Sequence, residues 1–103
     1  MQKYPVRPSH RANLAVDRLE ATGRTVFGTV SRDGDRITVR FGAISELSVR
    51  GEARELVVEL SMDPKVPEEV ARETIARYNR FLEEVTGYSS KERARRLRKS
   101  AGS

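Results

Sequence analysis

The spacing of apolar residues changes twice along this chain of 103 residues. Apolar side chains recur every three to four residues over 9–22, at every second residue over 25–62, and again at helical spacing over 67–85. Alternation at every second residue gives a strand one apolar and one polar face, whereas a spacing near 3.6 gives a helix an apolar stripe. The sequence therefore predicts a sheet framed by two helices, a protein of the α+β class.

Turn-forming residues divide the alternating segment into strands. Gly34 lies in a short polar segment that is typical of a hairpin turn, and Gly42-Ala43 forms either a tight turn or a bulge. A short edge strand is expected at the N-terminus, because Pro5 cannot donate a hydrogen bond to a sheet. The expected strands are 3–7, 25–30, 36–41, 44–50 and 56–62. The side chains expected to face inward are Ile37, Val39, Phe41, Leu47, Val49, Leu56, Val58, Leu60 and Met62.

Two longer segments have helical patterns. The first runs over 9–22, with Ser9 as a possible cap and Gly23 as the expected stop. The second begins at Pro67, a residue favoured in the first helical turn, and is closed by Gly87. Its expected apolar stripe is Ala71, Ile75, Tyr78, Leu82 and Val85, flanked by Val70 and Phe81. Tyr88 is expected to fold back on this helix.

These elements follow one another in the order β-α-β-β-β-β-α. We expect an antiparallel sheet of four to five strands with helices on one face, an order that resembles the repeat unit of TATA-binding-protein-like folds in topology only. Residues 1–88 would form a single domain, and 89–103 a basic C-terminal helix with a frayed tail. Ser89 and Glu92 have the spacing of a capping box at the start of that helix.

Several chemistries lack the residues that they need. The chain has no cysteine, hence no disulfide, no thiolate nucleophile and no cysteine-based metal site. Its single histidine, His10, is expected to be exposed or to cap a helix. Asp33-Gly34-Asp35 is typical of a turn, and the glycines form no phosphate-binding loop. We expect no cofactor, no metal and no enzymatic activity.

The apolar runs are also too short for a membrane. The longest, such as Leu56-Val57-Val58, fall far below the roughly 20 residues that a spanning helix needs. The first residues, Met1 to Pro5, lack the apolar core of a secretory signal. We expect a cytoplasmic protein without a membrane partner.

Positive charge is concentrated at the C-terminus. Residues 1–90 hold 14 basic and 14 acidic residues, whereas 91–99 hold six basic residues and Glu92, so this segment carries the whole net charge of +5. Such a segment is attracted to phosphate backbones without reading base sequence; a solvated terminus that aids solubility is the alternative. The candidate phosphate contacts are Lys91, Arg93, Arg95, Arg96, Arg98 and Lys99.

The outer face of the sheet is a second candidate surface. It is expected to carry Arg36, Arg40 and Arg50 among Phe27, Thr38, Ser48 and Val57. Sheets that bind RNA stack bases on two or three aromatic residues, and here only Phe27 is available. Glu46 and Glu59 would share the face, so cross-strand ion pairs are the favoured interpretation. The same face, or an edge strand, could pair with a second copy of the chain.

Part of the C-terminal half has a more specific pattern. Tyr78-Asn79-Arg80-Phe81-Leu82, Thr86-Gly87-Tyr88 and the basic run 91–97 resemble the C-terminal signature of a small family of uncharacterised archaeal proteins. The similarity is concentrated in residues 75–98, with an echo at Tyr4 and at Phe41-Gly42-Ala43. The resemblance implies an archaeal cytoplasmic protein and supplies no catalytic residues.

These observations favour a non-enzymatic binding module that contacts RNA or DNA backbone through its basic helix. The alternative is a structural or adaptor protein that acts through self-association, as a homodimer, or through a protein partner. A small-molecule site between sheet and long helix is a third possibility, although Tyr78, Phe81 and Met62 there are more simply core residues.

Overall fold

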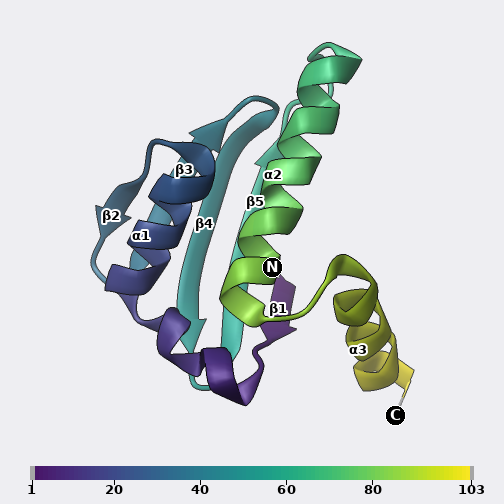
Figure 1. Ribbon diagram of the computed structural model, residues 1–103. Helices are drawn as coiled ribbons and strands as arrows, with labels where there is room; N and C mark the ends of the chain where they lie inside the picture. Colours follow the sequence, from purple (N-terminus) through teal and green to yellow (C-terminus); the bar gives the residue numbers. More distant parts are fainter. Residues whose placement is uncertain (1, 103) are drawn as a thin grey trace.

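A computed structural model describes the backbone of residues 2–102 and the side chains of residues 2–96. Five antiparallel strands form one sheet in the order β1-β5-β4-β3-β2, and α1 and α2 lie side by side on one of its faces (Figure 1). The fold class, the element order and the placement of the helices agree with the prediction. The elements are β1 (Gln2–Pro5), the 3-10 helix η1 (Pro8–Leu14), α1 (Val16–Phe27), β2 (Ser31–Asp33), β3 (Arg36–Phe41), β4 (Ile44–Glu52), β5 (Glu55–Met62), α2 (Glu68–Thr86) and α3 (Ser90–Gly102).

The core lies between the sheet and the two helices. The predicted inward residues Ile37, Val39, Leu47 and Val49 are buried, and Phe41 is partly buried against them. Val49 pairs with Ile37 on one side and Val58 on the other. Phe81 from α2 is fully buried against this layer and contacts Phe27, with ring centroids 5.5 Å apart. Alternating apolar residues on the strands therefore meet the apolar side of each helix in one continuous cluster.

A tight turn joins β3 to β4 at Gly42-Ala43, which settles the choice between turn and bulge. Phe41 pairs with Ile44, and Gly42 has a φ of 52°, a left-handed conformation that favours glycine. The strand register shifts on both sides of this turn. The backbone N–H of Ala43 donates to the Oγ1 atom of Thr74, 2.9 Å away, so the turn is attached to α2.

The prediction for the first helix was wrong in its boundaries. A 3-10 helix occupies the first half, and Ala15 interrupts it with extended backbone (φ −63°, ψ 139°) before α1 begins. Gly23 lies inside α1, where a Cβ atom would come within 2.9 Å of Val30 Cγ2. Close packing of helix on strand, and not helix termination, thus requires glycine there. The helix ends at Gly28, with a φ of 90°, so residues 25–27 belong to α1 and β2 is only three residues long.

The predicted limits of α2 agree with the structure within one residue. Its predicted stripe is also confirmed at Leu82, Val85 and the flanking Phe81, which are buried, but not at Ile75. Gly87 caps the helix in the left-handed conformation, as expected. Thr74 is fully buried, whereas Ile75 is 51% exposed. On β5, Leu60 and Met62, which were expected to face inward, are 37% and 39% exposed. None of the helices within the described residues is long and apolar enough to cross a membrane.

Candidate nucleic-acid interface

A capping box starts α3, as predicted from Ser89 and Glu92. The Ser89 backbone N–H donates to Glu92 Oε1 over 3.2 Å, and the Glu92 N–H donates to Ser89 Oγ over 3.3 Å. The hydrogen bond from the Ser89 backbone holds the pKa of the Glu92 carboxyl below its usual value. These reciprocal bonds satisfy two donors at the helix start and fix the direction in which α3 leaves α2.

Arg93 anchors α3 to the body of the protein. Its side chain is only 3% exposed, and Nη1 donates to the Tyr88 carbonyl over 2.6 Å while Nη2 donates to Asn79 Oδ1 over 3.1 Å. Burial lowers the pKa of this guanidinium from its usual value. The expectation that Arg93 contacts phosphate therefore needs correction, since its donors are directed toward α2 and the interhelical segment.

Arg7, from the segment between β1 and η1, holds the other side of the α2–α3 junction. Its Nε donates to the Gly87 carbonyl over 3.0 Å, and its Nη2 lies 3.2 Å from Glu92 Oε2. The Arg7 guanidinium carbon is 4.6 Å from the centroid of the Tyr88 ring, and that of Arg96 is 4.2 Å from it. Tyr88 is buried, as predicted. The basic segment is thus a docked helix that lies beside the N-terminal strand β1 and contacts α2 (Figure 1).

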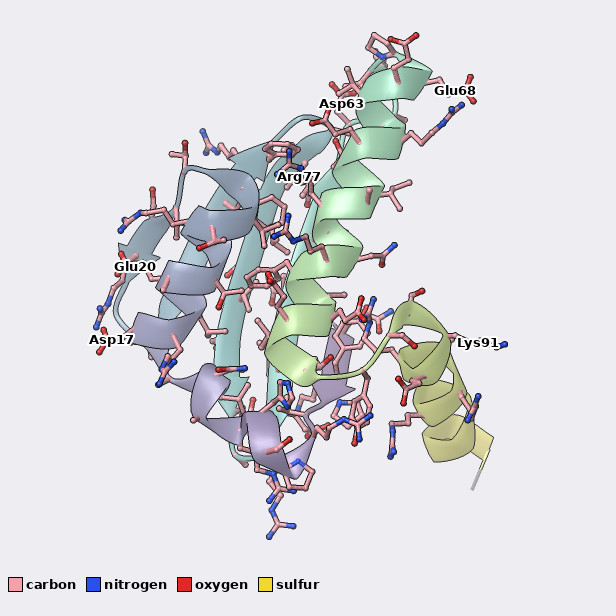
Figure 2. The ribbon with its side chains drawn as sticks, viewed as in Figure 1. Asp17, Glu20, Asp63, Glu68, Arg77 and Lys91 are labelled. Atoms are coloured by element: carbon pink, nitrogen blue, oxygen red, sulfur yellow. The ribbon has the colours of Figure 1, made fainter. Side chains whose placement is uncertain are left out.

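The docking selects which cations face solvent. Lys91, Arg95 and Arg96 are exposed, and we call these three residues the α3 basic face. The Lys91 side chain points away from the rest of the molecule (Figure 2). None of the three forms an ion pair within residues 2–96. The predicted contacts Arg98 and Lys99 lie outside the residues whose side chains the structure describes.

On the outer face of the sheet, Arg36 and Arg50 are cross-strand neighbours. Arg36 lies 4.0 Å from Asp33 on the neighbouring strand β2, a cross-strand ion pair of the expected kind. Arg50 lies 3.0 Å from Glu52, but both residues belong to β4, so this pair runs along one strand and not across two. Arg40 is exposed and has no ion pair within residues 2–96.

The expected aromatic residue of the outer face is absent from it. Phe27 belongs to α1 and is buried in the core, so placing it on this face was wrong. Val57 lies between Lys3 and Arg50 in the cross-strand row and is buried although no helix covers it. The face therefore offers hydrogen bonds and charge but no platform for stacking bases.

Two features of the candidate interface had no recognisable signal in the sequence. Arg7 gave none, because its contacts with Gly87 and Glu92 join residues 80 and 85 positions apart. Asn79 belongs to the archaeal signature, but its pairing with Arg93 is visible only in three dimensions.

His10 lies against Gly87 and contacts Ser9 Oγ through Nδ1 at 3.0 Å, so its position is that of a packing residue.

Residues 2–96 contain no group of three or more His, Asp or Glu side chains that could hold a metal ion.

The fold and the site together define a two-layer α+β sandwich that carries a docked basic helix.

The chain belongs to the family described as a domain of unknown function, DUF5611, whose pattern it matches over residues 1–99. The solution structure of the hypothetical protein TA0095 from Thermoplasma acidophilum has the same fold, with a TM-score of 0.69 and 26% sequence identity. That similarity covers 94% of this chain and 97% of the Thermoplasma chain. No curated protein matches the sequence. These similarities confirm the resemblance to an uncharacterised archaeal family that the C-terminal signature indicated.

Proposed function

We propose that the protein is a non-enzymatic module that binds the phosphate backbone of nucleic acid through the α3 basic face. The observation that carries this proposal is that different residues of α3 dock the helix and face the solvent. Arg93 and Glu92 form the hydrogen bonds that dock the helix, while Lys91, Arg95 and Arg96 remain exposed without carboxylate partners in residues 2–96. Of these three, Arg96 also contacts the Tyr88 ring through its guanidinium.

A docked helix presents its charges differently from a flexible tail. Because the side chains of Lys91 and Arg95 extend from a helix of fixed direction, binding a backbone costs less conformational entropy than ordering a free segment. Residues 1–90 are balanced in charge, so the net positive charge of the protein is concentrated in the C-terminal segment. Such contacts recognise backbone charge and not base sequence.

The test is binding of fluorescent single- and double-stranded oligonucleotides across a salt series. The triple variant Lys91→Gln, Arg95→Gln, Arg96→Gln removes three positive charges without removing α3. Deleting α3 is less informative, because it would also remove the Arg96 contact with the Tyr88 ring and the Glu92 partner of Arg7. Affinity falls as salt rises, so the slope of log affinity against log salt is negative. We expect the magnitude of this slope to decrease by about 0.9 for each duplex phosphate contact that the variant loses.

The matched control is Arg11→Gln, Arg18→Gln, Arg54→Gln. These three arginines are exposed and form no ion pair within the described side chains. Replacing them lowers the net charge by the same amount as the α3 triple variant does. We expect the control to retain the wild-type salt slope. Equal losses in both triples would attribute binding to overall charge, and absence of binding by the wild-type protein at low salt would refute the proposal.

A second candidate function, self-association, is favoured by three large hydrophobic residues that are exposed to solvent. Leu60 and Met62 lie on β5, and Ile75 lies on α2. Leu60 also lines a hollow of about 310 Å³ together with Gln2, Tyr4, Val58 and Tyr78. Light scattering over a range of protein concentrations tests a homodimer, and a monomeric mass at high concentration would exclude it.

A further inference from the structure

Residues that precede and form β2 alternate between the two faces of the sheet. Val30 packs against the core beside Gly23, and Arg32 reaches Asp17 and Glu20 of α1. Ser31, between these two inward residues, therefore points to the opposite, outer face, and Thr29 lines the same hollow as Ser31. Thr29 and Ser31 are both exposed there, on the side of the sheet away from α1 and α2.

The neighbouring strand places two more polar side chains on the same face. Ser31 pairs across the ladder with Thr38, and Arg40 follows two residues later on β3. Thr29, Ser31, Thr38 and Arg40 together line a hollow of about 350 Å³, which we call the hydroxyl hollow. Its volume is near the lower end of small-ligand sites, which span about 300–1,000 Å³. The lining thus combines three hydroxyl groups with one guanidinium.

Charge pairing leaves this guanidinium available. Arg36 and Arg50, the other two arginines of the outer face, lie within ion-pair distance of Asp33 and Glu52. Arg40 has no such partner within residues 2–96, and no carboxylate lines the hollow. A ligand that enters it meets one full positive charge and hydroxyl donors.

We propose that the hydroxyl hollow binds a phosphate group. A guanidinium matches the oxygens of phosphate in a bidentate manner, and its hydrogen bonds to an anion are stronger than those between neutral groups. The hydroxyls of Thr29, Ser31 and Thr38 can each donate one further hydrogen bond. The site is separate from the α3 basic face, because β2 lies at the opposite edge of the sheet from β1, which α3 contacts.

The experiment is a titration of the isotope-labelled full-length protein with inorganic phosphate, followed by amide NMR shifts, with ionic strength kept constant by sodium chloride. Saturable shifts are expected at residues 29–31 and 38–40. Arg40→Gln should weaken the apparent affinity by about tenfold or more, since a charged hydrogen-bond partner is lost. Thr38→Val, a second variant of similar shape, should weaken it by a few-fold. Arg36→Gln, the matched control on the same strand, should leave it unchanged.

Shifts that do not saturate, or an Arg40→Gln affinity equal to wild type in a variant with unchanged thermal unfolding, would overturn the proposal. A second titration uses an oligothymidylate without terminal phosphates. The same shifts would identify the nucleic-acid backbone as a source of the phosphate, and their absence with shifts by inorganic phosphate would identify a small phosphate ligand. The α3 triple variant should retain the phosphate titration, so the two proposals can fail independently.

Discussion

Replacing Arg93 by methionine keeps an unbranched side chain but removes the guanidinium that anchors α3. The change deletes hydrogen bonds of 2.6 Å and 3.1 Å to the Tyr88 carbonyl and Asn79 Oδ1. Hydrogen bonds to charged groups contribute about 1.5–3 kcal/mol each, but methionine avoids the cost of burying a cation. We therefore expect a net loss of about 2 kcal/mol in the free energy that docks α3, which corresponds to about 30-fold more frequent opening.

Amide hydrogen exchange measures this loss directly, because an undocked helix of 13 residues is marginal in water and exchanges quickly. We expect exchange in α3 to accelerate about 30-fold in Arg93→Met, while amides of β3 and β4 keep their protection. Arg95→Met is the control, since Arg95 is exposed on the same helix. Equal α3 exchange rates in the two variants would refute the conclusion that Arg93 holds the helix in place.

Two further predictions concern the core and the helix cap. Thr74→Val removes the acceptor of the buried Ala43 N–H and should lower the free energy of unfolding by about 1–3 kcal/mol in urea denaturation, whereas Thr74→Ser should retain most of it. The pKa of Glu92 is lowered in the folded protein, chiefly by the Ser89 backbone hydrogen bond, so its stabilisation is present above the usual value of 4.5 and lost as pH falls through the folded pKa. Protection of α3 amides should therefore decline in acid, and Glu92→Gln should abolish that pH dependence.

The elements that the sequence predicted well are those in which local preference and tertiary packing agree. The predicted range 36–41 coincides with β3, because its alternating side chains fit both the ladder and the core. The end of α2 at Gly87 likewise follows from local backbone chemistry, since a left-handed residue closes the helix there.

Prediction failed where packing overrode local preference. The β-branched residues Thr25 and Val26 favour a strand, yet they form the last turn of α1, because Val26 is buried in the layer between helix and sheet. Gly23 was interpreted as a stop although its role is to let α1 approach Val30 and Ile37 closely. A single sequence does not distinguish these two uses of glycine.

The candidate interface was only partly predictable for a related reason. Composition located the basic segment and the cap pattern located its start, but six cations in nine residues look alike in sequence. Burial of Arg93 depends on Asn79, fourteen positions earlier, and on the Tyr88 carbonyl. The hydroxyl hollow depends on the reversal of direction between β2 and β3, which places Ser31 opposite Thr38.

The contacts of Arg7 also bear on the order of events during folding. They join Arg7 to Gly87 and Glu92 across 80 and 85 positions, whereas β4 and β5 pair through a turn that places Glu52 opposite Glu55. The entropy of loop closure increases with the length of chain enclosed, so local hairpins form at lower cost than the contact between the two ends. The β3–β4–β5 meander can thus assemble early, and the contact between Arg7 and α3 would form after the sheet.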